Sequence, residues 1–171
     1  MSRLFFHVIS LFLLFTIQVS FIHSLPYPFD RIPLVVITTV YLYQYANKTS
    51  MWWWLICYGF VLDILSISQA PLEVLSYGLA SGAMILLVSH VFTNRSFYGM
   101  AASALLSLLV LGLSELMILG VGTLFSSPFF WKQILLTQGW AMLFASLLLL
   151  FVFPSLRRVR TLAQRLLFKQ I

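Results

Sequence analysis

Six runs of apolar residues make up most of the chain, and charge, proline or asparagine gathers in the short stretches between them. Each run is nearly unbroken over roughly 15 to 25 residues. At about 1.5 Å per residue, the longer runs can cross a hydrocarbon core of about 30 Å. The pattern predicts six membrane spans, the second and third being the shortest. Their expected bounds are Leu4–His23, Ile32–Ala46, Met51–Ile67, Leu72–Phe92, Phe97–Phe125 and Trp131–Phe153.

Apolar and polar residues do not alternate within these runs, as they would in the strands of a membrane barrel. Lipid offers the backbone no hydrogen-bond partners, so an apolar segment pairs its own N–H and C=O groups by forming a helix. Composition agrees, because 61% of the residues are apolar and 8% are charged, against about a quarter charged in a soluble domain. We expect an all-α fold, a polytopic membrane helical bundle with short loops.

The first run follows a short basic lead, as the apolar part of a secretory signal does. A signal peptide ends at a small-x-small cleavage site, and Ser24–Pro28 contains none. We therefore interpret Leu4–His23 as a retained membrane anchor, with Pro33 in the first turn of the next span.

Lysine and arginine indicate the orientation, because they are enriched in cytoplasmic loops. With six spans both termini lie on one side, and placing them in the cytoplasm leaves only Arg31 and Lys132 outside. The cations expected inside are Arg3, Lys48, Arg95, Arg157, Arg158, Arg160, Arg165 and Lys169. The charge pattern thus predicts that both termini are cytoplasmic.

The stretch after Pro154 is the only one with a soluble character, and it divides the chain into a transmembrane bundle, 1–154, and a tail, 155–171. On a helix, the apolar residues of the tail share one face opposite most of its cations. The cations of interest are Arg157, Arg158, Arg160, Arg165 and Lys169. We expect a basic amphipathic helix on the cytoplasmic surface that binds membrane lipids or docks a partner, and the alternative is that its charges only determine the topology. No nucleic-acid partner is expected, because no globular basic domain accompanies the tail.

The chemistry of an enzyme is missing from the sequence. Cys57 is the single cysteine, and the three histidines lack the spacing of metal ligands. No nucleophile or phosphate-binding motif occurs. We expect no catalytic residues, no metal and no cofactor.

The acidic residues are the most informative polar positions, because a charge at membrane depth is costly and usually faces protein or water. Asp30, Asp63, Glu73 and Glu115 are all expected in the outer half of the membrane, with Asp63 at about mid-depth. They are candidates for a polar site that binds a partner or supports the structure.

One explanation of these acids is an outward-facing polar cavity, and the alternative is that Asp30 and Glu73 are ordinary loop residues. Asp63 needs something to offset its cost in either case. The nearest polar partners in sequence are Tyr77 and Ser81, and water from the outer side is the other possibility.

Small residues mark expected helix contacts, because they let backbones approach closely. Gly78 and Gly82 are four residues apart in the fourth span, and Gly99 begins a similar series in the fifth. Together with Gly59 in the third span, they are interpreted as packing positions within the bundle rather than as a dimer interface.

Three stretches, Phe29–Leu34, Gly59–Leu65 and Pro71–Tyr77, together resemble the MreD family of rod shape-determining proteins. That family has a proline and an aspartate before its second span, a Gly-x-x-x-Asp helix, and Pro-Leu-Gly before the next helix. Two departures are that Glu73 stands in place of the family's glycine and that the order of Pro and Asp is altered.

The resemblance implies a non-enzymatic scaffold of the cell-wall elongation machinery in the bacterial cytoplasmic (inner) membrane. Its implied partners are MreC, MreB and the RodA glycosyltransferase with its transpeptidase. The alternative is the substrate-binding component of an energy-coupling-factor vitamin transporter, also a six-helix bundle of this size. Such components usually carry an Ala-x-x-x-Ala face in the first helix, and Leu4–His23 has no alanine.

Overall fold

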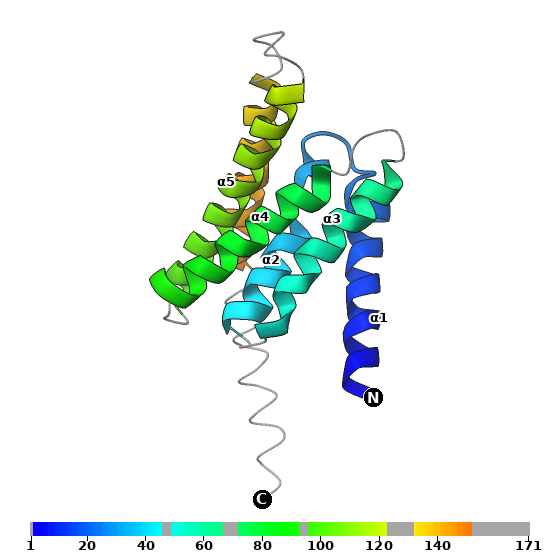
Figure 1. Ribbon diagram of the computed structural model, residues 1–171, viewed down its shortest axis with the longest axis vertical. Coiled ribbons are helices and arrows are strands. Elements are labelled where there is room, and N and C mark those ends of the chain that lie inside the picture. The colour runs from blue at the N-terminus through cyan, green and yellow to red at the C-terminus, as the bar shows by residue number, and fades with distance from the viewer. Residues whose placement is uncertain (1, 46–48, 67–71, 93–95, 123–131, 152–171) are drawn as a thin grey trace, which may run out of the picture.

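The computed structural model describes residues 2–45, 49–66, 72–92, 96–122 and 132–151. These residues form an all-α bundle, and none of them lies in a β-strand (Figure 1). In chain order the helical segments are α1 (Ser2–Thr16), η1 (Ile17–Ile22), η2 (Phe29–Arg31), α2 (Leu34–Val40), η3 (Tyr41–Tyr45), η4 (Thr49–Trp52), α3 (Trp53–Leu65), α4 (Leu72–Leu86), η5 (Leu87–Val91), α5 (Phe97–Gly122) and a last helix, Lys132–Phe151. The predicted fold class is confirmed.

Among the described residues, three helices are long and apolar enough to cross a membrane, which marks the chain as a membrane protein: Leu72–Val91, Phe97–Ile118 and Lys132–Phe151. Two apolar helices, Val8–Ile22 and Ser50–Leu65, are shorter. The second expected span is shorter still, because α2 and η3 together rise only about 18 Å at 1.5 Å per residue.

The structure moves two expected boundaries. Pro33 is the N-cap of α2 rather than a residue of its first turn, and the helix begins at Leu34. A proline fits this position, because its missing N–H would have no partner at a helix start. The third span ends at Leu65, where Ser66 closes the helix with a backbone hydrogen bond to Leu62.

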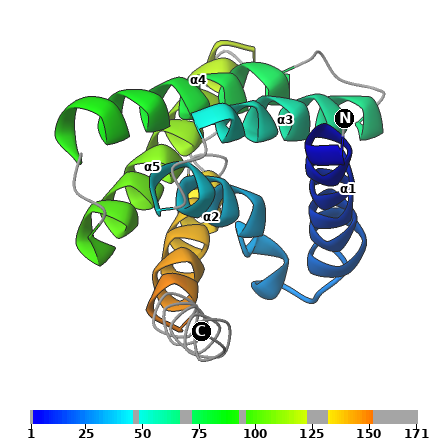
Figure 2. The ribbon, with the colours of Figure 1, turned by 90° about the horizontal axis from the view of Figure 1, so that it is seen from below.

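α4 is central to the described bundle, since it packs along α3 on one side and α5 on the other. α2 contacts both α3 and α5, and the last helix lies beside α5 (Figures 1 and 2). The amino end of α1 and the carboxyl end of Lys132–Phe151 lie at the same end of the bundle, which we call the terminal end (Figure 1). The opposite end, which we call the loop end, carries η2 and the start of α4.

The core is built from aliphatic and aromatic side chains where α2, α3, α4 and α5 meet. Leu55, Met84 and Ala104 are fully buried there, and the ring of Tyr58 packs on those of Phe15 and Tyr77 at centroid distances of 5.2 and 5.1 Å. The outer surface is also apolar. Large side chains such as Phe5 and Phe12 are mostly exposed, as suits a protein surrounded by lipid chains.

Candidate functional site

Asp63 caps the start of the neighbouring helix. It lies in the last turn of α3, and its two carboxylate oxygens accept hydrogen bonds from the backbone N–H groups of Glu73 and Val74, at 3.0 and 2.8 Å. Both N–H groups belong to the first turn of α4, where no carbonyl within the helix can accept them. A carboxylate at this position also interacts favourably with the helix dipole. The cost of placing Asp63 in an apolar helix is therefore offset by backbone donors.

This arrangement corrects the prediction of Tyr77 or Ser81 as the partner of Asp63. The Ser81 hydroxyl donates instead to the carbonyl oxygen of Trp52, at 3.1 Å. Asp63 also lies near the end of α3 rather than at mid-depth, because the helix ends at Leu65. The position of Asp63 in the helix could be predicted from the sequence. Its partners could not, because backbone N–H groups do not depend on the type of residue.

Gly59 brings the two helices close enough for this cap. A Cβ atom added at Gly59 would lie 2.8 Å from the carbonyl oxygen of Glu73 and 3.0 Å from the Cα of Val74, closer than real contacts allow. Because Gly59 and Asp63 are one turn apart, both face the start of α4. We call these residues, with the first turn of α4, the Asp63 cap.

The other glycines predicted for packing behave differently. In the described part of the chain, a Cβ added at Gly78 or Gly82 would meet nothing within 4 Å, so these two glycines do not bring described helices together as predicted. Gly99 is buried, and its carbonyl accepts a hydrogen bond from the fully buried Ser103, at 2.8 Å.

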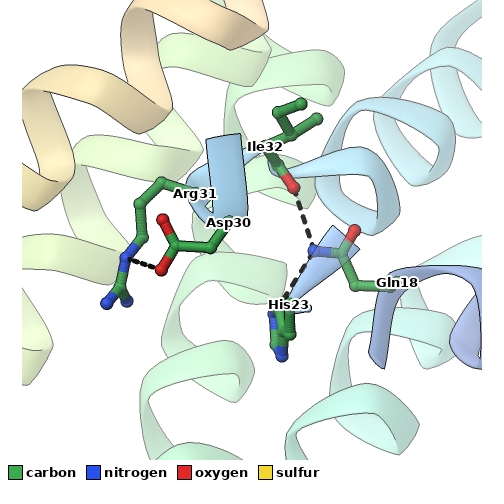
Figure 3. A network of polar contacts seen from close by, with 5 residues as sticks. All are labelled: Gln18, His23, Asp30, Arg31 and Ile32. Atoms are coloured by element: carbon green, nitrogen blue, oxygen red, sulfur yellow. Dashed lines mark hydrogen bonds and ion pairs between the residues drawn. The ribbon is translucent and has the colours of Figure 1, made fainter. Parts of the chain in front are cut away.

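Gln18, a polar residue of the first apolar run, holds the chain where it re-enters the bundle. Its Nε2 donates to the carbonyl oxygen of Ile32 at 2.9 Å (Figure 3), and its Oε1 accepts from the N–H of Leu34 at 3.1 Å. Its Nε2 also lies 3.4 Å from Nε2 of His23. The side-chain amide thus pairs with the backbone on both sides of Pro33. The sequence analysis missed this role, although a glutamine inside an apolar run is a visible signal.

A polar cavity of about 130 Å³ lies beside the Gln18 side chain, at the loop end of the bundle. Its walls come from η1, the loop around η2, α2, α3, α4, α5 and the last helix. The lining residues are Gln18, His23, Asp30, Arg31, Ile32, Pro33, Val35, Val36, Tyr58, Tyr77, Leu108, Leu111, Glu115, Thr137, Gln138 and Ala141. Of the four predicted acids, Asp30 and Glu115 line it, whereas Asp63 and Glu73 do not.

Glu115 is held by a side-chain amide from the last helix. Its Oε2 accepts a hydrogen bond from Nε2 of Gln138, at 3.2 Å. Gly112, one turn before Glu115, leaves the space that Gln138 fills, because a Cβ there would lie 2.6 Å from the Gln138 Cγ. The sequence analysis did not single out Gly112 or Gln138.

Asp30 lies in η2 and lines the cavity. Its Oδ2 pairs with Nε of Arg31 at 2.8 Å (Figure 3). Next to it in η2, the ring of Phe29 packs on that of Phe144 in the last helix, with 5.5 Å between the ring centroids. Oδ1 of Asp30 and Oε1 of Gln138 are buried without a hydrogen-bond donor in the described chain. The cavity therefore has an excess of hydrogen-bond acceptors.

A second hollow of about 290 Å³ adjoins the cavity and shares Arg31 and Thr137 with it. It is lined by Tyr27, Arg31, Lys132, Gln133, Leu136 and Thr137, two of them cations and none of them acidic. The outer hollow is therefore positively charged, on Arg31 and Lys132.

Among the described residues, no three His, Cys, Asp or Glu side chains gather closely enough to hold a metal ion. The basic tail, with Arg157, Arg158, Arg160, Arg165 and Lys169, lies outside the described residues. Comparison of the chain with protein-family models, curated proteins and solved structures returns no match.

Proposed function

We propose that this chain is a non-enzymatic membrane scaffold of the bacterial cell-wall elongation machinery, with a role like that of MreD. It acts in the cytoplasmic membrane, and its partners are MreC, MreB and the RodA–transpeptidase complex. The observation that carries the proposal is the Asp63 cap. Two stretches that resemble the family, around Gly59 and around Glu73, meet there as one structural unit.

The cap gives the resemblance a physical reason. A Gly-x-x-x-Asp helix followed by a new helix start is the pattern needed to join two helices through a carboxylate and a close backbone approach. It keeps α3 and α4 in fixed register and leaves their other faces for lipid or partner proteins. Because the described loops are short, a partner reaches the chain mainly through helix faces and the two ends of the bundle.

In the proposed orientation both termini are cytoplasmic and the loop end faces outward. The described ends of the chain lie at the same end of the bundle (Figure 1), as an even number of crossings requires. Arg31 and Lys132, the two cations expected outside, both line the hollow at the loop end. The Asp63 cap and the cavity then lie on the outer side, where a periplasmic partner such as MreC would dock.

The polar cavity favours a second candidate, the substrate-binding component of an energy-coupling-factor transporter. The first span argues against this role, because Leu4–His23 has no alanine for the usual coupling face. The inner cavity alone, at about 130 Å³, is also below the roughly 300 Å³ at which pockets for drug-sized ligands begin, although the adjoining hollow adds about 290 Å³.

Affinity purification in mild detergent, followed by mass spectrometry, tests the proposal. The full chain with a tag at Ile171 is expected to recover cell-wall elongation proteins at native expression, whereas an equally tagged, unrelated membrane protein is not. Recovery of an ATPase with its membrane coupling protein would instead establish the transporter role. Normal rod shape in cells depleted of the protein would also count against the scaffold.

A further inference from the structure

The two adjoining hollows at the loop end have opposite chemistry. The inner cavity is lined by three side chains with acceptor oxygens, Glu115, Asp30 and Gln138, and Oδ1 of Asp30 and Oε1 of Gln138 are buried behind its surface without a described donor. The outer hollow presents the cations Arg31 and Lys132 and no acid. Arg31 separates the two, since it lines both and pairs with Asp30.

Pairing between Asp30 and Arg31 leaves the carboxyl group of Glu115 inside, which a bound cation would keep ionised, and one positive charge outside, on Lys132. A ligand of matching polarity carries a cation that points inward and an anion that points outward. We propose that the two hollows together bind a zwitterion in which a primary ammonium is joined by a short chain to a phosphate. The headgroup of phosphatidylethanolamine and free phosphoethanolamine both have this chemistry.

Hydrogen bonding selects a primary ammonium rather than a quaternary one. An ammonium group has three N–H donors, and Glu115, Asp30 and Gln138 can accept one each once the buried oxygens of Asp30 and Gln138 turn towards the cavity. A trimethylated nitrogen has no donor and would leave the two unpaired oxygens unsatisfied. The volume also fits, because about 130 Å³ equals about four water molecules at roughly 30 Å³ each, enough for an aminoethyl group.

The outer hollow suits the phosphate. Guanidinium and ammonium groups are the usual protein partners of phosphate. Arg31 is bound to Asp30 through Nε, which leaves its terminal nitrogens for the ligand. The hollow lies at one end of the bundle, and Lys132, which lines it, is the first residue of the apolar helix Lys132–Phe151. This inference goes beyond the scaffolding role and does not depend on it.

Native mass spectrometry of the purified full chain in detergent tests the proposal with lipids of identical acyl chains. Phosphatidylethanolamine is expected to bind about tenfold more tightly than phosphatidylcholine or phosphatidylglycerol, since only it supplies both charges and the N–H donors. Equal retention of the three lipids would overturn the proposal. Displacement by free phosphoethanolamine at comparable concentration would identify a soluble ligand, and its failure to compete would identify the lipid.

Glu115→Gln removes the inner charge while keeping a side chain that can pair with Gln138, and it is expected to abolish the preference for phosphatidylethanolamine over phosphatidylcholine. Glu73→Gln is the matched control, because Glu73 is an acid at the same end of the bundle but does not line the cavity. A preference that survives Glu115→Gln, or that is lost equally in the control, would overturn the proposal.

Lys132 provides a second test that does not disturb the core, since its side chain is exposed. Lys132→Gln is expected to weaken binding of phosphatidylethanolamine about tenfold, and Lys132→Arg to restore it, because either cation can pair with a phosphate. Both variants should elute as wild type in gel filtration. Unchanged binding in Lys132→Gln would show that Lys132 does not bind the phosphate and would overturn the assignment of the outer hollow.

Discussion

Asp63 and Glu115 are both carboxylates placed in apolar helices, yet their surroundings differ. Both oxygens of Asp63 accept short hydrogen bonds from backbone N–H groups that have no acceptor within their own helix. Glu115 has one longer bond, from the side chain of Gln138, and faces a cavity with further unpaired acceptors. Asp63 therefore stabilises the fold, whereas Glu115 can still accept hydrogen bonds from a ligand. The hydrogen-bond partners of an acidic side chain in the membrane, rather than its depth there, thus indicate whether its role is structural or in binding.

Asp63→Leu is the strongest test of this comparison. It leaves the N–H groups of Glu73 and Val74 unpaired, and we expect a loss of about 3 kcal/mol in the free energy of unfolding. Asp63→Asn should lose about half as much, because an amide has one acceptor oxygen for the two donors. Unfolding in detergent followed by circular dichroism measures both. A fully stable Leu variant would show that the cap contributes nothing.

Gly59→Ala should produce the next largest effect. The new methyl group would press on the backbone of α4, which has no side chain to rotate away, so we expect a loss of about 1 to 3 kcal/mol. Gly78→Ala is the matched control in the facing helix. Its methyl group meets nothing within 4 Å, and the better helix propensity of alanine should stabilise the protein by up to about 1 kcal/mol. Equal effects of the two substitutions would contradict the close approach at Gly59.

Gly112→Ala is expected to cost less than Gly59→Ala, about 1 kcal/mol or below, although its new Cβ would lie closer to its neighbour. The atoms in the way belong to the flexible side chain of Gln138, which can rotate by changing its side-chain torsions. That rotation separates Gln138 from Glu115. Thermal unfolding should therefore change little, while reaction of Glu115 with a hydrophobic carbodiimide, mapped by mass spectrometry, should increase.

Glu115→Gln should have the smallest effect on stability, within about 1 kcal/mol of wild type and in the stabilising direction. The substitution removes a charge whose burial in the membrane is costly, and the new amide can still pair with Gln138. The contrast with Asp63→Asn, measured under the same conditions, is the informative quantity. A destabilisation as large as that of Asp63→Asn would mean that Glu115 is also a structural acid.

The helical architecture could be predicted because continuous apolar runs have one solution in lipid, and the order of the helical segments follows the runs. The end of α3 was placed two residues late and the start of α2 two residues early. Both ends depend on single residues, Ser66 and Pro33, rather than on hydrophobicity.

The polar sites were only partly predictable. The four acids stand out in an apolar sequence, and their gathering at one end follows from counting residues along the spans. Asp63 binds backbone atoms, and Gln138 approaches Glu115 from a helix 23 residues away in the chain, so neither partnership has a sequence pattern. Gly78 and Gly82 show the converse, a familiar spacing that packs against nothing within the described chain.

The Asp63 cap joins residues that are only 10 and 11 positions apart, and this bears on how the protein is made. Chains emerge from the ribosome with the amino end first, so α3 and the first turn of α4 can lock together before α5 is synthesised. The cavity, in contrast, needs residues from the first helix to the last. A nascent chain halted after α4 would therefore contain a finished helical hairpin but no binding site, and the site would form only when the last helix is inserted.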